Sequence, residues 1–234
     1  MSERCLVVLG MHRSGTSCLT GMIEQCGVNL GEVFTENPFN RKGNRESAKV
    51  QVLNNDVLAL NGGGWNHPVT VESWNEDLCA RRDEILEELK SGAASWWGFK
   101  DPRVMFTLPF WLDAIDEPSF IATFRHPYRV ALSLQSRDRT SLEEGYALWL
   151  EYNMKLLEWE ERFHFDLVDF DVPDDVYGTE VAARISKLGL NGLEAMDFFD
   201  ASLRHQFTEP TGGIDLPEEV EKVYQALKDQ HALL

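Results

Sequence analysis

Apolar and polar positions alternate in blocks along the chain, and the first block is the clearest. Residues 5–10 are almost entirely apolar, a short polar loop covers 11–15, and apolar positions then recur at helical spacing over 15–26. A short apolar run fits a buried strand, whereas spacings of three and four fit one face of a helix. Gly27 follows, and glycine commonly ends a helix. The pattern predicts a strand, a tight loop and a helix.

The same alternation continues through the rest of the chain. Further helices are expected at about 46–60, 75–91, 104–114, 128–135, 141–161, 174–188 and from 217. Further strands are expected at 95–99, 119–124 and 165–170, and a long loop rich in Gly, Asn and Pro at 31–45. Strands that alternate with helices are typical of a parallel sheet with helices on both faces. We therefore expect an α/β fold that forms a single domain over residues 1–234.

The loop after the first strand has the composition of a phosphate-binding loop. Gly10 and Gly15 have the spacing of the two glycines in such a loop, which directs backbone N–H groups and a helix N-terminus toward an anion. Thr16 occupies the position where a nucleotide triphosphatase has its lysine, and the nearest cation is Arg13. The sequence thus predicts a P-loop-type fold that holds a nucleotide phosphate without a lysine on a γ-phosphate.

Basic residues follow three of the apolar runs directly. Arg13 comes after the first run, Lys100 and Arg103 after the second, and Arg125 after the third. Because ligands of a parallel α/β sheet bind at the carboxyl ends of its strands, these cations are expected to converge on one edge.

The chain is acidic, with 22 Lys and Arg against 39 Asp and Glu and a net charge of −17. This charge argues against binding to nucleic acid or to an anionic membrane surface. No apolar stretch is long enough to span a bilayer, and the first apolar run is too short for a signal peptide. The four cysteines lack metal-ligand spacing and fit buried thiols in a reducing compartment. We expect a cytoplasmic protein with no membrane span.

Three spaced segments resemble motifs of the sulfotransferases that use 3′-phosphoadenosine 5′-phosphosulfate, in the bacterial and Golgi-type branch. The loop 10–17, Gly-Met-His-Arg-Ser-Gly-Thr-Ser, resembles the family's 5′-phosphosulfate loop. The segment 125–133, Arg-His-Pro-Tyr-Arg-Val-Ala-Leu-Ser, resembles its 3′-phosphate element. Residues 100–102, Lys-Asp-Pro, resemble a motif of the protein-tyrosine branch whose lysine lies near the transferred group.

The resemblance implies a role for each matching residue. Arg13 contacts the bridging region of the donor, while the loop backbone and the hydroxyls of Thr16 and Ser17 hold the 5′-phosphate. Arg125 and Ser133 bind the 3′-phosphate. The donor-binding residues expected in this way are His12, Arg13, Ser14, Gly15, Thr16, Ser17, Arg103, Arg125, Ser133 and Arg204.

Sulfuryl transfer depends on positioning and on cations around the leaving phosphate, by analogy with phosphoryl transfer. No Asp ends the apolar runs before Lys100 or Arg125, where a carboxylate that holds magnesium would be expected. We therefore predict a reaction without a metal.

The acceptor hydroxyl needs a general base. Glu46 matches the Gly-x-x-Glu element that related enzymes have after the first helix, with Glu36 and His12 as alternatives. The expected catalytic residues are Glu46, Arg13 and Lys100. The acceptor is expected to be a small molecule, a carbohydrate or a lipid-linked hydroxyl, with Trp65 and His67 as candidate walls of its pocket. Arg137 and Arg139, in the basic loop after a helix, are further candidate site residues or else solvated surface residues.

Two other functions are compatible with the same loop. A P-loop kinase of a small metabolite would use the loop for ATP, although the lysine at position 16 is absent. A binding module without catalytic activity would retain only the nucleotide site.

Overall fold

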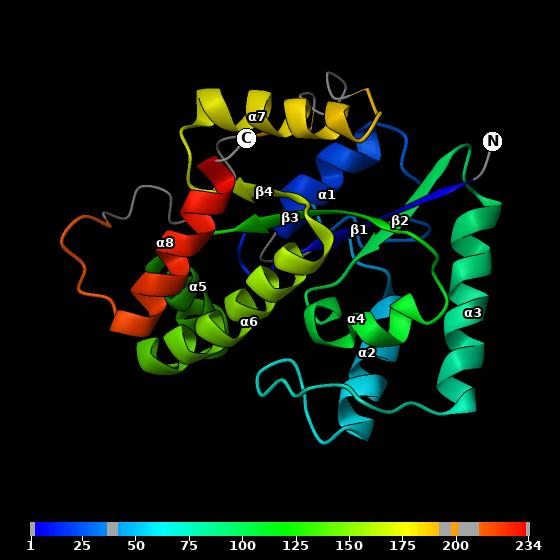
Figure 1. The fold of residues 1–234 in the computed structure, drawn as a ribbon, viewed down its shortest axis with the longest axis horizontal. Helices are drawn as coiled ribbons and strands as arrows, with labels where there is room; N and C mark the ends of the chain where they lie inside the picture. Colours follow the sequence, from blue (N-terminus) through cyan, green and yellow to red (C-terminus); the bar gives the residue numbers. More distant parts are fainter. Residues whose placement is uncertain (1–2, 37–41, 192–197, 201–210, 233–234) are drawn as a thin grey trace.

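The computed structural model describes residues 3–36, 42–191, 198–200 and 211–232. Within these ranges, four strands form one sheet with the order β2-β1-β3-β4, in which all neighbours are parallel (Figure 1). The strands are β1 (Arg4–Leu9), β2 (Trp96–Lys100), β3 (Ser119–Phe124) and β4 (Asp166–Asp169). The α/β fold expected from the alternating pattern is confirmed, and the single domain stays a prediction.

Helices cover both faces of the sheet (Figure 1). They are α1 (Thr16–Gln25), α2 (Ala48–Leu60), α3 (Glu76–Ser91), α4 (Val104–Leu112), α5 (Pro127–Asp138), α6 (Leu142–Phe163), α7 (Asp174–Lys187) and α8 (Glu218–Ala232). Helices α1 and α7 pack on one face, and the other helices pack on the opposite face. None of the helices in the described ranges has the length and apolar character needed to cross a bilayer.

The central strand β1 shows why its sequence is apolar throughout. Val7 and Leu9 belong to the core beneath α2, α4 and α6, whereas Leu6 and Val8 belong to the core beneath α1 and α7. Successive side chains of a strand point to opposite faces, so a strand covered on both faces needs apolar residues at every position.

The sheet order brings the three basic segments to one edge. Strand β1 lies between β2 and β3, with Val8 beside Lys100 and Leu9 beside Ala122. All strands run the same way, so the loop after β1, the end of β2 and the residue after β3 meet at the carboxyl edge. Strands β2 and β3 lie on opposite sides of β1, so the strand order reverses at β1. In α/β sheets, ligands bind at the carboxyl edge beside such a reversal.

One helix boundary differs from expectation in a way that matters. The expected helix at 46–60 begins at Ala48, so Glu46 precedes it instead of lying in its first turn. Glu46 is buried and forms an ion pair with Lys100 at the end of β2. A tertiary contact with Lys100, and not a place in the first turn of α2, therefore holds Glu46.

Candidate active site at the carboxyl edge of the sheet

The loop after β1 is held tightly against β3 and β4. A Cβ atom on Gly10 would lie 2.5 Å from the carbonyl oxygen of Thr123, and one on Gly15 would lie 2.2 Å from the Phe170 ring. Both glycines also have positive φ, at 139° and 85°. Larger residues at these two positions would therefore push the loop away from the sheet and move the start of α1.

The backbone of this loop is arranged to receive an anion. Arg13 has a left-handed φ of 67°, and Gly15, directly before α1, is also left-handed with a φ of 85°. No side chain among the described residues caps α1. The N–H of Cys18 bonds to the Gly15 carbonyl oxygen, and the N–H groups of Thr16 and Ser17 have no partner in the described ranges. The hydroxyl oxygen of Ser14 is buried without a hydrogen-bond partner in the described part of the chain. Open donors at a helix N-terminus, with a positive helix dipole, favour a bound phosphate.

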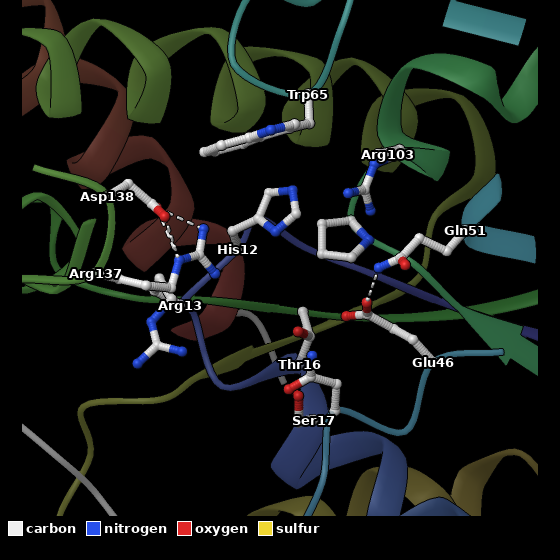
Figure 2. A pocket seen from close by; sticks show the side chains of 12 residues that line it. His12, Arg13, Thr16, Ser17, Glu46, Gln51, Trp65, Arg103, Arg137 and Asp138 are labelled. Atoms are coloured by element: carbon white, nitrogen blue, oxygen red, sulfur yellow. Dashed lines mark hydrogen bonds and ion pairs between the residues drawn. The ribbon is translucent and has the colours of Figure 1, made fainter. Parts of the chain in front are cut away.

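A cavity of about 300 Å³ opens beside the loop (Figure 2). Figure 2 shows Thr16 and Ser17 on one side of it and Trp65 on the opposite side. The cavity is lined by His12, Arg13, Thr16, Ser17, Asn44, Glu46, Gln51, Trp65, Pro102, Arg103, Arg137 and Asp138. Six of the residues singled out from the sequence as donor-binding or catalytic thus share one cavity: His12, Arg13, Thr16, Ser17, Glu46 and Arg103.

Lys100 reaches the loop from the end of β2. Its Nζ atom lies 2.6 Å from Oε1 of Glu46 and 3.5 Å from the hydroxyl oxygen of Ser17. The second carboxylate oxygen of Glu46 accepts a hydrogen bond from Gln51. The Lys100 and Glu46 side chains are only 1% and 8% exposed. A buried pair of this kind holds a lysine ammonium next to the phosphate loop without leaving either charge unpaired.

Arg125 and Ser133 both contact the loop through Arg13. The Nε atom of Arg13 donates a 2.7 Å hydrogen bond to the Ser133 hydroxyl, and Nη1 of Arg125 lies 3.4 Å from the carbonyl oxygen of Arg13. Ser133 lies in the second turn of α5, and Arg125 directly follows β3. The two residues predicted for one phosphate are therefore brought together, although they are 8 residues apart in the sequence.

Asp171 organises the same region from beyond β4. Its carboxylate accepts hydrogen bonds from Arg125, from Arg129 and from the backbone N–H of His126. Asp171 was not selected from the sequence. It directly follows the strand expected at 165–170, so a search for acidic as well as basic residues at strand ends would have found it.

Arg103 is anchored by the buried carboxylate of Asp101. Its Nη1 atom lies 3.1 Å from both oxygens of Asp101, and Oδ1 of Asp101 also accepts the backbone N–H of Arg103. Burial raises the pKa of Asp101, and the nearby Arg103 opposes this effect. The Nε atom of Arg103 is buried and has no partner in the described ranges, and Arg103 lines the cavity.

Arg13 remains a cation in this crowded setting. Burial, followed by the nearby charges of Arg137 and Arg125, lowers its pKa to about 10, while Asp138 opposes the decrease. A pKa of about 10 leaves the guanidinium protonated near neutral pH. The loop therefore carries its own positive charge even though the whole chain has a net charge of −17.

The wall opposite the loop is formed by Trp65 and Arg137. The Arg137 guanidinium lies 5.5 Å from the centroid of the Trp65 ring, and it also pairs with Asp138. The backbone oxygen of Trp65 accepts a hydrogen bond from the Tyr152 hydroxyl, which ties this turn to α6. Trp65, a candidate pocket wall from the sequence, and Arg137, a further candidate, both line the cavity.

Some candidates lie elsewhere. Glu36, His67 and Arg139 are exposed and do not line this cavity. Arg204 falls outside the described residues. Asn44, Gln51 and Asp138 line the cavity but were not selected from the sequence. They come from the long loop, from α2 and from the end of α5, and no local pattern distinguishes them from exposed polar residues.

Comparisons with known proteins identify the fold. The sequence matches no protein-family model, and no curated protein matches it. Among solved structures, a sulfotransferase domain from the curacin biosynthetic pathway is similar, with a TM-score of 0.56 at 12% identity over 97% of this chain and 98% of that chain. A sulfotransferase domain from the Synechococcus PCC 7002 olefin synthase is similar with a TM-score of 0.54 at 13% identity, over 97% and 95% of the two chains. The chain therefore has the α/β fold of sulfotransferase domains.

Proposed function

We propose that the chain is a sulfotransferase that moves a sulfuryl group from 3′-phosphoadenosine 5′-phosphosulfate to a hydroxyl of a small-molecule, carbohydrate or lipid-linked acceptor. The observation that carries the proposal is the meeting of Arg13, Lys100 and Arg125 around one glycine loop. Each cation comes from the carboxyl end of a different strand, and each is within 3.5 Å of an atom of the loop or belongs to it. The sulfotransferase-like fold supports the same reading.

The loop would bind the 5′-phosphosulfate. The open N–H groups at the start of α1, the Ser14 hydroxyl and the hydroxyls of Thr16 and Ser17 supply donors for phosphate oxygens. Gly10 and Gly15 permit this path because any side chain there would collide with Thr123 or Phe170. The donor set thus fits a phosphate of a nucleotide.

Arg125 and Ser133 would bind the 3′-phosphate. Ser133 is engaged by Arg13, and Arg125 is engaged by Asp171. A dianionic phosphate can replace the Ser133–Arg13 contact and add to the Arg125–Asp171 contact, because a guanidinium presents several N–H donors. The extra phosphate distinguishes this nucleotide from AMP.

Transfer would proceed in line. The acceptor oxygen forms a bond to sulfur while the bond from sulfur to the 5′-phosphate oxygen breaks. Negative charge develops on the leaving phosphate, where Arg13 and Lys100 can stabilise it. The acceptor proton goes to a base in the cavity, for which Glu46 and His12 are the candidates. Arg103 contributes a further N–H group on the cavity side.

A transfer assay without metal tests this function. The chain is incubated with the donor, in the presence of a chelator, and a panel of phenols, alkyl alcohols, monosaccharides and glycolipids. Formation of 3′,5′-bisphosphoadenosine that depends on an acceptor is the expected result. The control uses ATP with magnesium in place of the donor. Sustained ADP formation in the control would indicate a kinase and contradict the proposal.

A further inference from the structure

His12 occupies a central position in the cavity that the donor-binding role does not explain. Its ring meets Trp65 edge-on at 5.2 Å between centroids and Tyr152 at 5.8 Å. The residue is only 9% exposed yet lines the cavity. Its Nε2 atom is buried and has no hydrogen-bond partner in the described ranges. A buried nitrogen without a partner, in a residue that lines a cavity, is a candidate to receive a hydrogen bond when a bound molecule fills the site.

The charges around His12 are almost all positive. Burial, and then Arg103, Arg137, Lys100 and Arg13, lower its pKa well below 6.5. The carboxylates nearest the cavity, Glu46, Asp101 and Asp138, are paired with Lys100, Arg103 and Arg137. In the nucleotide-free protein the imidazole is therefore neutral, and it is a poor acceptor of a further proton. Figure 2 shows the ring between Arg137 on one side and Arg103 on the other, below Trp65.

A bound donor would place negative charge next to the cations that surround the His12 ring. The 3′-phosphate and the phosphosulfate together carry roughly four negative charges near neutral pH, since a phosphate monoester has a second pKa near 6. They would lie at the loop that begins two residues before His12, against the cations that now disfavour a proton on the ring. Negative charge near a histidine favours its protonated form.

Glu46 is less suited to take a proton. One of its oxygens accepts from Lys100 at 2.6 Å and the other from Gln51 at 3.2 Å. Protonation of this carboxyl would leave the buried ammonium of Lys100 without its counter-charge, which is costly. The geometry fits Glu46 as the residue that positions Lys100.

We propose that His12 is the general base of the transfer, and that binding of the anionic donor turns its imidazole from a poor proton acceptor into an effective one. The proposal rests on the sulfotransferase function proposed above. The acceptor O–H proton moves to Nε2, directly or through one water, as the new O–S bond forms. The S–O bond to the 5′-phosphate breaks, the bisphosphate leaves, and the imidazolium releases its proton to solvent.

The most direct test is a pH titration of the histidine ¹³Cε1 resonances by NMR, with and without 3′,5′-bisphosphoadenosine. Of the 6 histidines, His12 is assigned by the loss of its signal in His12→Gln, or in His12→Asn if that variant does not fold. The titration midpoint of His12 is expected to move to higher pH when the bisphosphate binds. His67, which is exposed and outside the cavity, serves as the internal control.

The role of His12 as a donor-switched base and the sulfotransferase function are contradicted by different results. A bisphosphate that binds without raising the His12 midpoint overturns the donor-switched base and leaves the sulfotransferase proposal standing. A bisphosphate that does not bind overturns the sulfotransferase proposal, and this inference with it. In addition, Arg137→Gln should raise the midpoint in the nucleotide-free protein, because it removes one of the cations that act on the ring. An unchanged midpoint in that variant contradicts the charge argument.

Kinetics supply an independent readout. His12→Gln is expected to lower kcat about 100-fold or more, while the affinity for the bisphosphate changes less than about threefold. His67→Gln is the matched control and should leave kcat unchanged. Imidazole added to His12→Gly should restore part of the rate, increasingly as the pH rises through the pKa of free imidazole. A His12→Gln enzyme that retains most of its kcat would refute the assignment.

Discussion

Two buried clusters of opposite charges flank the glycine loop, and they are built differently. The lysine cluster consists of Lys100 at the end of β2 and Glu46 from the segment before α2, with Gln51 as a further partner. In the arginine cluster, Asp171 after β4 binds Arg125 after β3 and Arg129 from α5.

The difference lies in how each carboxylate is held. Asp171 also accepts the backbone N–H of His126, so it keeps charged and neutral partners if one arginine is lost. Among the described residues, Glu46 has a single cation as its partner, and only an amide would remain without it. The lysine cluster is therefore the more important of the two for stability, whereas the arginine cluster can lose or share a guanidinium and is better suited to exchange a contact with a ligand.

The largest expected effect concerns stability. Lys100→Met should lower the free energy of unfolding by about 3–5 kcal/mol, because it leaves the buried Glu46 without a counter-charge. Arg125→Gln should cost less than half of this, since Arg129 continues to pair with Asp171. Denaturant unfolding measures both values. The double variant Lys100→Met/Glu46→Gln is the control and should recover much of the loss, and equal losses for the two single variants would contradict the comparison.

For nucleotide binding, we expect the arginine cluster to matter more than the lysine cluster, which is the opposite of the order expected for stability. Arg125→Gln should weaken binding of 3′,5′-bisphosphoadenosine by about 1.5–3 kcal/mol, which is the contribution of a charge-assisted hydrogen bond. Binding of AMP should change little, because AMP lacks the 3′-phosphate. Calorimetric titration of the variant with both nucleotides makes the measurement. If both affinities fall equally, Arg125 does not recognise the 3′-phosphate.

A smaller effect is expected at Ser133. Ser133→Ala should weaken binding of the bisphosphate by about 0.5–1.5 kcal/mol, as expected for one neutral hydroxyl donor. The same titration provides the value, and Ser136→Ala is a matched control, because Ser136 is an exposed serine on the same helix whereas Ser133 is buried and bonded to Arg13. An effect of the same size at Ser136 would show that the helix as a whole, and not the hydroxyl, responds.

The last prediction is a pH dependence of stability that arises at His126, beside the arginine cluster. Burial, opposed by Asp171, lowers the pKa of His126 to about 4, from 6.5. Between these values the unfolded chain binds a proton that the folded chain does not, so stability falls as the pH decreases from about 6.5 toward 4. His126→Gln should make the decrease shallower in urea unfolding measured across this range. A decrease of the same slope in the variant would rule out His126 as its source.

The fold, and the candidate site residues at the strand ends, could be predicted from the sequence for a physical reason. Strands buried on both faces must be apolar throughout, so β1 and β3 stand out, and the residues that follow them lie at the ligand-binding edge. Ser133 was singled out only through the resemblance, and its hydrogen bond with Arg13 was not predicted. The convergence of Arg13, Lys100 and Arg125 needed only the local pattern and the parallel arrangement.

The rest of the site depends on loops that fold back from a distance. Glu46 meets Lys100 across 54 residues, and Trp65 is held over His12 by a hydrogen bond from Tyr152, 87 residues away. Neither contact leaves a periodic signal in the sequence. Glu46 was singled out only through the resemblance, and its ion pair with Lys100, which bears directly on its role, emerges only from the tertiary structure.

The central claim is that cations from separate strand ends bind an adenosine nucleotide through two phosphate sites. Calorimetric titration of the unaltered chain with 3′,5′-bisphosphoadenosine and with AMP, in a chelator, tests it most directly. The account predicts that the bisphosphate binds at least about tenfold more tightly, as expected from one added charge-assisted contact. Equal affinities for the two nucleotides, or no binding of the bisphosphate without a divalent cation, would contradict it.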